Sequence, residues 1–171
     1  MKKQVLLMLL VCIGFHTLEA QTKSEKKQLK LEKDKQAYEF TKRMIASGDF
    51  TFFGEWLFPL GGGRINLIGN PNHLKFEGGE VDGYLPFFGV IHRIGAYNGR
   101  GGIEFKGEAE DYEVTHNEDK QRINIEFDVE NKIEQFNVSL TVYAKGTASM
   151  VVNSNNRNSI SYRGKIKPLE K

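Results

Sequence analysis

The side chains best suited to acid–base chemistry are three histidines outside the N-terminal segment, His73, His92 and His116. No two of them stand at helical or hairpin spacing, and the HExxH pattern of zinc hydrolases is absent, so the sequence predicts no metal site. The polar residues after His116 indicate a hairpin tip. His92 lies among aromatic residues and glycines, and it is the one histidine that we consider as a general base.

Other patterns that carry chemistry are incomplete. The glycines at 61–63 precede Arg64 without the Lys-Ser/Thr pair and the helix of a phosphate loop, and 99–102 lacks the strand-to-helix context of a dinucleotide fingerprint. No GxSxG elbow occurs. The acidic residues within 104–111 alternate like the solvated face of a strand, whereas a glycosidase needs two carboxylates at a set separation across a cleft. The sequence therefore predicts no catalytic residues and no cofactor.

The most distinctive segment, residues 84–107, combines bulky aromatic side chains with many glycines. Glycine allows a positive φ or a close approach to the backbone, so this combination is typical of either a tight architectural crossing or a binding surface. As a binding surface it would form an apolar pocket in which a few polar groups orient a ligand. The candidate ligand-binding residues are Trp56, Tyr84, Phe87, Phe88, His92, Arg93, Tyr97, Arg100, Arg157 and Tyr162.

Arg157 stands among four asparagines, near the C-terminal end of the chain. The planar guanidinium carries a fork of hydrogen-bond donors that suits carboxylates and carbonyls. Two alternatives follow. Arg157 either orders the last hairpin or binds an anion.

Residues 1–20 have the three parts of a secretory signal peptide. Two lysines precede an apolar run at 5–15, and Ala20 provides a small residue for cleavage. The run is too short to span a bilayer. The competing interpretation is a lipoprotein signal ending at Cys12, but Val11 occupies the place where lipidation requires a small residue. We therefore expect an exported protein, periplasmic or secreted, without a lipid anchor or a transmembrane span. Its sole cysteine would leave with the signal.

The charges of the chain nearly balance. There are 24 basic and 22 acidic residues, a formal net charge of +2, so a nucleic-acid partner is not expected. Lysines crowd residues 21–36, where they indicate a charged linker or frayed helix rather than a patch for lipid headgroups. Without residues 1–20 the chain has about 150 residues, and a chain of this length buries roughly 70% of its unfolded surface. This favours a single domain, over 37–171.

The periodicity of the apolar residues changes after Gly48. An apolar stripe from Ala37 to Ile45, which includes Phe40, predicts a helix that docks on the domain. From there the period is two. The strand at 50–58 has aromatic residues on both faces, so we expect both faces to be covered. Later strands have one polar and one apolar face.

Connections of only a few residues favour an all-β antiparallel meander. Eight to ten such strands close most simply into a barrel, because closure removes exposed edges; a two-sheet sandwich is the alternative. Large side chains at the inward positions favour a packed interior. These positions are Ile125, Phe127, Val138, Leu140, Met150 and Tyr162.

Three groups of residues resemble the pattern of an uncharacterised Bacteroidetes family of exported proteins, domain of unknown function 4251. They are Tyr84, Leu85, Pro86, Phe87, Phe88 and Gly89; Gly101, Gly102, Ile103 and Phe105; and Asn156, Arg157, Ser159, Ile160, Ser161, Tyr162 and Gly164. The resemblance runs from about residue 40 to 166. It implies a small exported protein with a lipocalin-like β-barrel, and it implies no activity.

Three functions stay open from the sequence. The first is an exported binding or envelope accessory protein for a small apolar or amphipathic ligand, held where Tyr84, Phe87 and Phe88 meet Trp56 and Tyr97. The second is a structural or partner-binding module that uses its glycine-rich loops as a protein contact surface. A hydrolase is third, because it would require His92 or the acidic residues to converge in a cleft.

Overall fold

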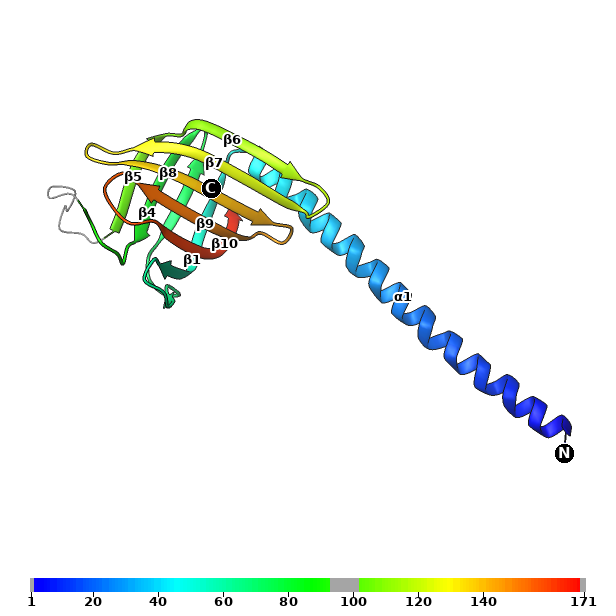
Figure 1. Cartoon of the computed structure of the whole chain (residues 1–171). Helices are drawn as coiled ribbons and strands as arrows, with labels where there is room; N and C mark the ends of the chain where they lie inside the picture. The colour runs from blue at the N-terminus through cyan, green and yellow to red at the C-terminus, as the bar shows by residue number, and fades with distance from the viewer. Residues whose placement is uncertain (1, 93–101, 170–171) are drawn as a thin grey trace. The chain divides into compact units, whose positions relative to one another are not determined.

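The computed structural model describes residues 2–92 and 102–169, with side chains from residue 23 onward. It divides into two units, residues 1–36 and 37–171. The described residues form one helix and ten strands. Figure 1 shows their course from the N-terminus to the C-terminus. They are α1 (Lys2–Ala46), β1 (Phe50–Pro59), β2 (Ile65–Asn66), β3 (His73–Glu77), β4 (Glu80–Pro86), β5 (Gly102–Glu108), β6 (Glu110–Asn117), β7 (Arg122–Glu130), β8 (Gln135–Tyr143), β9 (Thr147–Ser154) and β10 (Ile160–Pro168). Within the described residues, no helix combines the length and apolarity that crossing a membrane would require.

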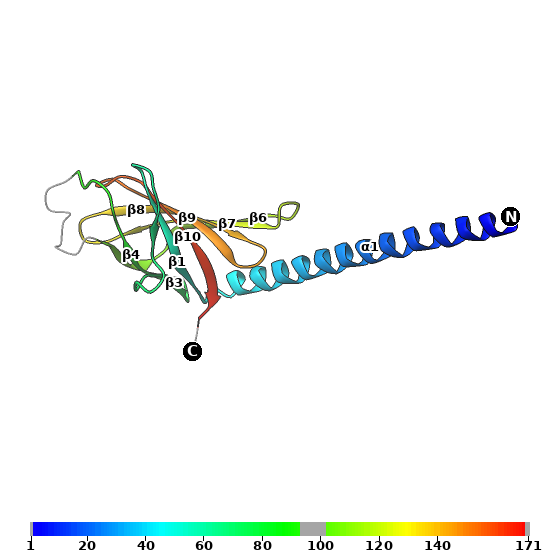
Figure 2. The same cartoon turned by 90° about the horizontal axis from the view of Figure 1, so that it is seen from below.

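All strands belong to one antiparallel sheet, as the short connections predict. The order is β5-β4-β3-β1-β10-β9-β8-β7-β6, with β2 added beside β1. The sheet curls so that β1, β3 and β4 form one wall and β7, β8 and β9 the opposite wall (Figure 2). It is nearly closed into a barrel, because β5 and β6 are its two ends and only Ala109 separates them along the chain. The prediction of an all-β meander with an N-terminal helix is confirmed.

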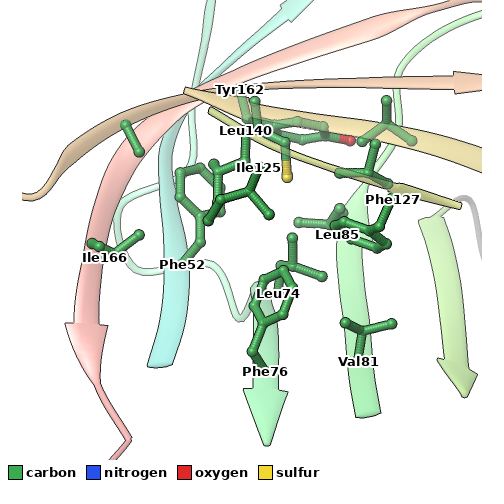
Figure 3. Close-up of a cluster of buried hydrophobic side chains, with 14 of the residues drawn as sticks. Phe52, Leu74, Phe76, Val81, Leu85, Ile125, Phe127, Leu140, Tyr162 and Ile166 are labelled. Carbon is green, nitrogen blue, oxygen red and sulfur yellow. The ribbon is translucent and has the colours of Figure 1, made fainter. Parts of the chain in front are cut away.

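The interior of the barrel is filled by large apolar side chains. Phe52 and Leu74 from one wall point toward Ile125 and Leu140 from the other, and Tyr162 reaches in from β10 (Figure 3). The burial pattern of β7 alternates strictly, as the polar and apolar alternation of its sequence predicts. The six inward positions expected to be large and buried are all at most 1% exposed.

The outer face of β1 differs from expectation. Phe53 is 41% exposed, so this face is not covered by another element as the aromatic residues on both faces had suggested. Instead, two cations from the neighbouring strand β10 lie over the rings: Lys167 Nζ is 5.6 Å from the Phe53 centroid, and Arg163 Cζ is 5.1 Å from that of Phe58. Each long side chain covers apolar area while its charge stays in water.

A bulge interrupts the pairing of β1 with β10 between Gly54 and Trp56. The backbone groups of Gly54 are satisfied by the buried side chain of Asn72, whose Oδ1 accepts from the Gly54 N–H at 2.7 Å and whose Nδ2 donates to the Gly54 carbonyl at 3.0 Å. The amide therefore takes the place of a strand partner.

The last turns of α1 pack on the barrel. Thr41 Oγ1 donates to the Ala144 carbonyl at 2.9 Å, at the turn between β8 and β9. The apolar stripe predicts this docking. The prediction is wrong for Phe40, which is exposed, because the buried face of the helix carries Tyr38 instead. The buried residues of these turns are Tyr38, Thr41, Met44 and Ile45.

Candidate functional site

A groove of about 510 Å³ opens where β4 ends and β5 begins, and we call it the loop-end groove. Its floor is apolar and buried, while its walls carry a few polar groups, which is the composition of small-molecule sites. The lining residues are Leu67, Asn70, Pro71, Tyr84, Leu85, Pro86, Phe87, Phe88, Gly102 and Glu104.

The neighbouring aromatic residues of this groove have different roles. The Phe87 ring is buried and lies so close to Gly89 that a Cβ there would stand 2.6 Å from Phe87 Cζ. Phe88 is 52% exposed and Tyr84 is 43% exposed, although both line the groove. The aromatic and glycine pattern thus encodes both an architectural contact, at Phe87, and an accessible aromatic surface, at Phe88 and Tyr84.

Tyr162 holds the end of β4 from inside the barrel. Its hydroxyl donates to the Pro86 carbonyl at 2.6 Å, next to the groove. Burial raises the pKa of the Tyr162 hydroxyl above its usual value, with a smaller opposing effect from the positive charge of Arg157. The buried phenol stays protonated and acts as a donor that fixes the strand end.

A buried ion pair lies beneath the groove. Arg157 and Glu134 have side chains that are 5% and 0% exposed. The guanidinium meets the carboxylate through two donors: Nε lies 2.6 Å from Glu134 Oε1, and Nη2 donates to Oε2. The Ser154 hydroxyl also donates to Oε1. The remaining nitrogen, Nη1, donates to the Gly102 carbonyl at 3.1 Å.

The guanidinium of Arg157 also lies 4.9 Å from the centroid of the Phe87 ring. One side chain thus connects the buried aromatic residue of the groove with the first residue of β5. Of the two alternatives for Arg157, the geometry supports the ordering of the last hairpin, because each of its three guanidinium nitrogens donates to a group within the protein.

The loop before β10 holds the segment that follows Phe88. The His92 N–H donates to the Asn156 carbonyl at 2.8 Å, and the Asn158 N–H donates to the Val90 carbonyl at 3.1 Å. The His92 ring is exposed, and its Nε2 lies 2.6 Å from Asn158 Oδ1. His92 is therefore in polar contact with an amide, and it does not line the groove.

Trp56 lies apart from the loop-end groove. Arg64 Cζ lies 4.7 Å from the centroid of the Trp56 ring, and Trp56 is not among the residues that line the groove. Arg93, Tyr97 and Arg100 lie outside the described residues. Of the ten predicted site residues, the structure brings Tyr84, Phe87 and Phe88 together in the lining and places Arg157 and Tyr162 as supports behind it.

The fold and these sites can be compared with known proteins. The family model for a domain of unknown function (DUF4251) matches residues 32–166. The chain belongs to this family. A crystal structure at 1.95 Å of a DUF4251 family protein from Bacteroides eggerthii DSM 20697 has the same fold, with a TM-score of 0.62 and 19% sequence identity; the alignment covers 77% of this chain and 87% of that chain. No curated protein matches.

The groove of this DUF4251 protein has few side chains that could take part in acid–base or nucleophilic chemistry. Its polar side chains are Tyr84, Glu104 and Asn70, and a single carboxylate does not form a nucleophile–base pair. Among the described residues, no cluster of three or more His, Cys, Asp or Glu side chains could hold a metal ion. The lining of the groove is therefore mainly aromatic and apolar.

Two features of this DUF4251 protein were not predicted from the sequence. Glu134 lies in the short loop between β7 and β8, where an acidic residue is normally solvated, so no local pattern marks it as buried. A second cleft lies beside β6, and it is lined by residues that the sequence places in separate elements, among them Ile45, Phe76 and Tyr112. The alternation of Tyr112 and Val114 in an otherwise polar strand was the available signal.

Proposed function

We propose that this protein is an exported binding protein that holds a small apolar or amphipathic molecule in the loop-end groove. The supporting observation is the pairing of two accessible aromatic side chains, Tyr84 and Phe88, with a floor made rigid by the buried Arg157–Glu134 pair. Preformed sites bind with a smaller ordering cost than flexible ones. A filled barrel interior leaves the groove, rather than the lumen, as the place for the ligand.

The ligand would lie against the exposed faces of Tyr84 and Phe88, with its polar group toward Glu104 and Asn70 of the lining. Aromatic side chains give large contact area with few rotatable bonds, which favours affinity. Removing an aromatic residue at the centre of a site costs about 2 kcal/mol or more, equivalent to at least about ten-fold in affinity.

Native mass spectrometry of the protein purified from its own cell envelope tests this proposal. We expect a bound small molecule whose occupancy falls strongly in Phe88→Ala. The matched control is Leu60→Ala, which removes another exposed apolar side chain in the turn after β1, outside the groove, and should keep full occupancy. A wild-type protein that carries no small molecule from the envelope would contradict the proposal.

The second candidate is a surface for a protein partner, and the exposure of Phe88 together with Val90 favours it. Neighbouring exposed apolar side chains on a structured loop are typical of contact surfaces. In a pull-down from envelope extract, this function predicts a defined partner that is lost in Phe88→Ala and retained in Leu60→Ala, with no small molecule bound to the free protein.

A further inference from the structure

The barrel has a seam between β5 and β6, the two ends of the sheet. No ladder of backbone hydrogen bonds joins these strands in the described part of the chain. The Ala109 N–H, between them, donates instead to the Gly79 carbonyl of the β3–β4 turn at 3.3 Å. Asn131 Nδ2 crosses the seam to the Glu104 carbonyl at 2.8 Å, farther along β5. The wall is therefore held together at the seam by isolated contacts.

Strand β6 turns apolar side chains toward this seam without burying them. Val114 pairs with Ile125 and His116 pairs with Ile123, so the register directs Val114 and His116 to the side on which β7 buries its residues. Every residue of β6 except Val114 is nevertheless exposed. The inward face of β6 thus lacks the covering that the inward face of β7 has.

A β-bulge directs a third side chain of β6 into the same space. The register shifts between Glu110 and Glu113, so that Asp111 and Tyr112 together oppose one residue of β7. Asp111 has φ of 49°, in the left-handed region that a non-glycine residue adopts at a cost. Bulges re-aim side chains, and here the Tyr112 ring comes to lie 6.2 Å from the Phe76 ring, centroid to centroid.

These side chains enclose a cleft of about 520 Å³, which we call the seam cleft. Its walls are the end of α1 (Ile45 and Ala46), Phe76 of β3, Ala109, and Tyr112 and Val114 of β6. The Phe76 ring is held in place by stacking on the Phe50 ring, with 4.4 Å between the two centroids. Partial burial raises the pKa of the Tyr112 hydroxyl, in keeping with its position at the mouth of an apolar space.

The lining of the seam cleft contains no Asp, Glu, Lys or Arg. Its volume falls in the range of about 300–1,000 Å³ typical of small-molecule sites and is too small for a protein domain. A ligand body that fits must therefore be narrow and apolar. The polar side-chain groups of the lining are those of Ser47 and His116 and the Tyr112 hydroxyl. A heavily hydroxylated molecule would lose more hydration there than these groups can replace.

We propose that the seam cleft is a second binding site, which takes an unbranched aliphatic chain such as that of a fatty acid. The chain lies between the end of α1 and the Tyr112 ring, with its polar head in solvent at the mouth. This site is independent of the loop-end groove, because the two lie at opposite ends of the β3–β4 hairpin: the seam cleft beside the turn at Gly78, the groove beside Tyr84.

Calorimetric titration with dodecanoate, dodecanol and dodecylamine tests the site. We expect all three to bind with affinities within a few-fold of one another, because the chain rather than the head makes the contacts. Ala46→Trp should weaken dodecanoate binding at least about ten-fold, since Ala46 is an exposed lining residue at the last position of α1 and the indole would fill the cleft. The control Thr115→Trp adds the same ring on the other face of β6, opposite Asn124, and should leave binding unchanged.

Methyl NMR of the wild-type protein gives a second readout that needs no variant. Dodecanoate should shift the methyl signals of Ile45, Ala109 and Val114, and Phe88→Ala should leave these shifts and the affinity unaltered. Failure of all three probes to bind at millimolar concentration would overturn the proposal. So would binding that shifts other methyl groups or survives Ala46→Trp undiminished. Loss of the groove ligand in Phe88→Ala, by contrast, bears only on the loop-end groove.

Discussion

Removal of the Arg157 guanidinium by Arg157→Met should destabilise the fold more than any loss of a surface ion pair. The side chain is 5% exposed, and among the described residues the change leaves the fully buried Glu134 carboxylate with the Ser154 hydroxyl as its remaining side-chain donor. Breaking a buried pair on one side costs about 3–5 kcal/mol, because an uncompensated charge remains away from water. Against a total stability of about 5–15 kcal/mol, this is a large fraction.

The expected loss corresponds to a Tm lowered by about 6–20 °C for a domain of this size. Urea unfolding followed by the fluorescence of Trp56, the single tryptophan of the chain, measures it directly. The double variant Arg157→Met with Glu134→Leu should be less destabilised than the sum of the single changes by about 2–3 kcal/mol, since it removes both charges together. Gly102 and Ser154 lose partners in the double variant, so full wild-type stability is not expected.

The exposed pair Lys165–Glu55 is the matched control. Its Nζ–Oε1 distance is 2.7 Å, but the side chains are 54% and 37% exposed. Lys165→Met should therefore cost only about 0.2–1 kcal/mol. The reasoning would be refuted if Arg157→Met cost no more than Lys165→Met, or if the Arg157–Glu134 cycle showed no coupling, because the pair would then be hydrated in solution.

Three further changes test the packing. Gly164→Ala should prevent normal folding, since its Cβ would stand 1.8 Å from the Phe53 carbonyl oxygen, whereas Gly107→Ala, with no atom within 4 Å, should be neutral by circular dichroism and thermal melting. Asn72→Leu should cost about 2–4 kcal/mol in urea, because two buried backbone groups lose their partners; a cost below about 1 kcal/mol would show that water replaces the amide. The raised pKa of Tyr162 keeps its proton in the folded state while the unfolded chain releases it near pH 10, so stability should fall as pH rises above about 10 and the fall should be shallower in Tyr162→Phe; parallel pH profiles for the two proteins would contradict this.

The strands were predictable where one face is wet and the other buried. In β7 and β8 the alternation of side chains is itself the physical cause of the fold, so their existence and pairing follow from the sequence. The extent of the helix end was predictable, but its buried face was not: Phe40 is exposed and Tyr38 is buried. A short apolar stripe near a helix end does not fix the rotation of the helix, which depends on its contacts with the barrel.

The candidate site was predictable only in part. Tyr84, Phe87 and Phe88 are close in sequence and share one strand end, so their proximity was readable. The sequence did not show that Trp56 lies outside the groove, because the direction of its ring depends on the bulge in β1 and on the pairing with β2. Glu134 and the seam cleft depend on contacts between segments far apart along the chain, and no local pattern encodes these.

The position of β10 in the sheet has a consequence for how the protein acquires its structure. The last strand lies between β1 and β9, and contacts such as Glu55 with Lys165 join residues 110 positions apart. A nascent chain therefore cannot complete its central ladder until its final residues are synthesised. Until then, the backbone groups of β1 that pair with β10 lack their strand partners. Long-range pairing of this kind slows folding, since the closure entropy is lost before the contacts form. A C-terminal deletion that removed β10 would therefore divide the sheet between β1 and β9 rather than shorten one of its ends.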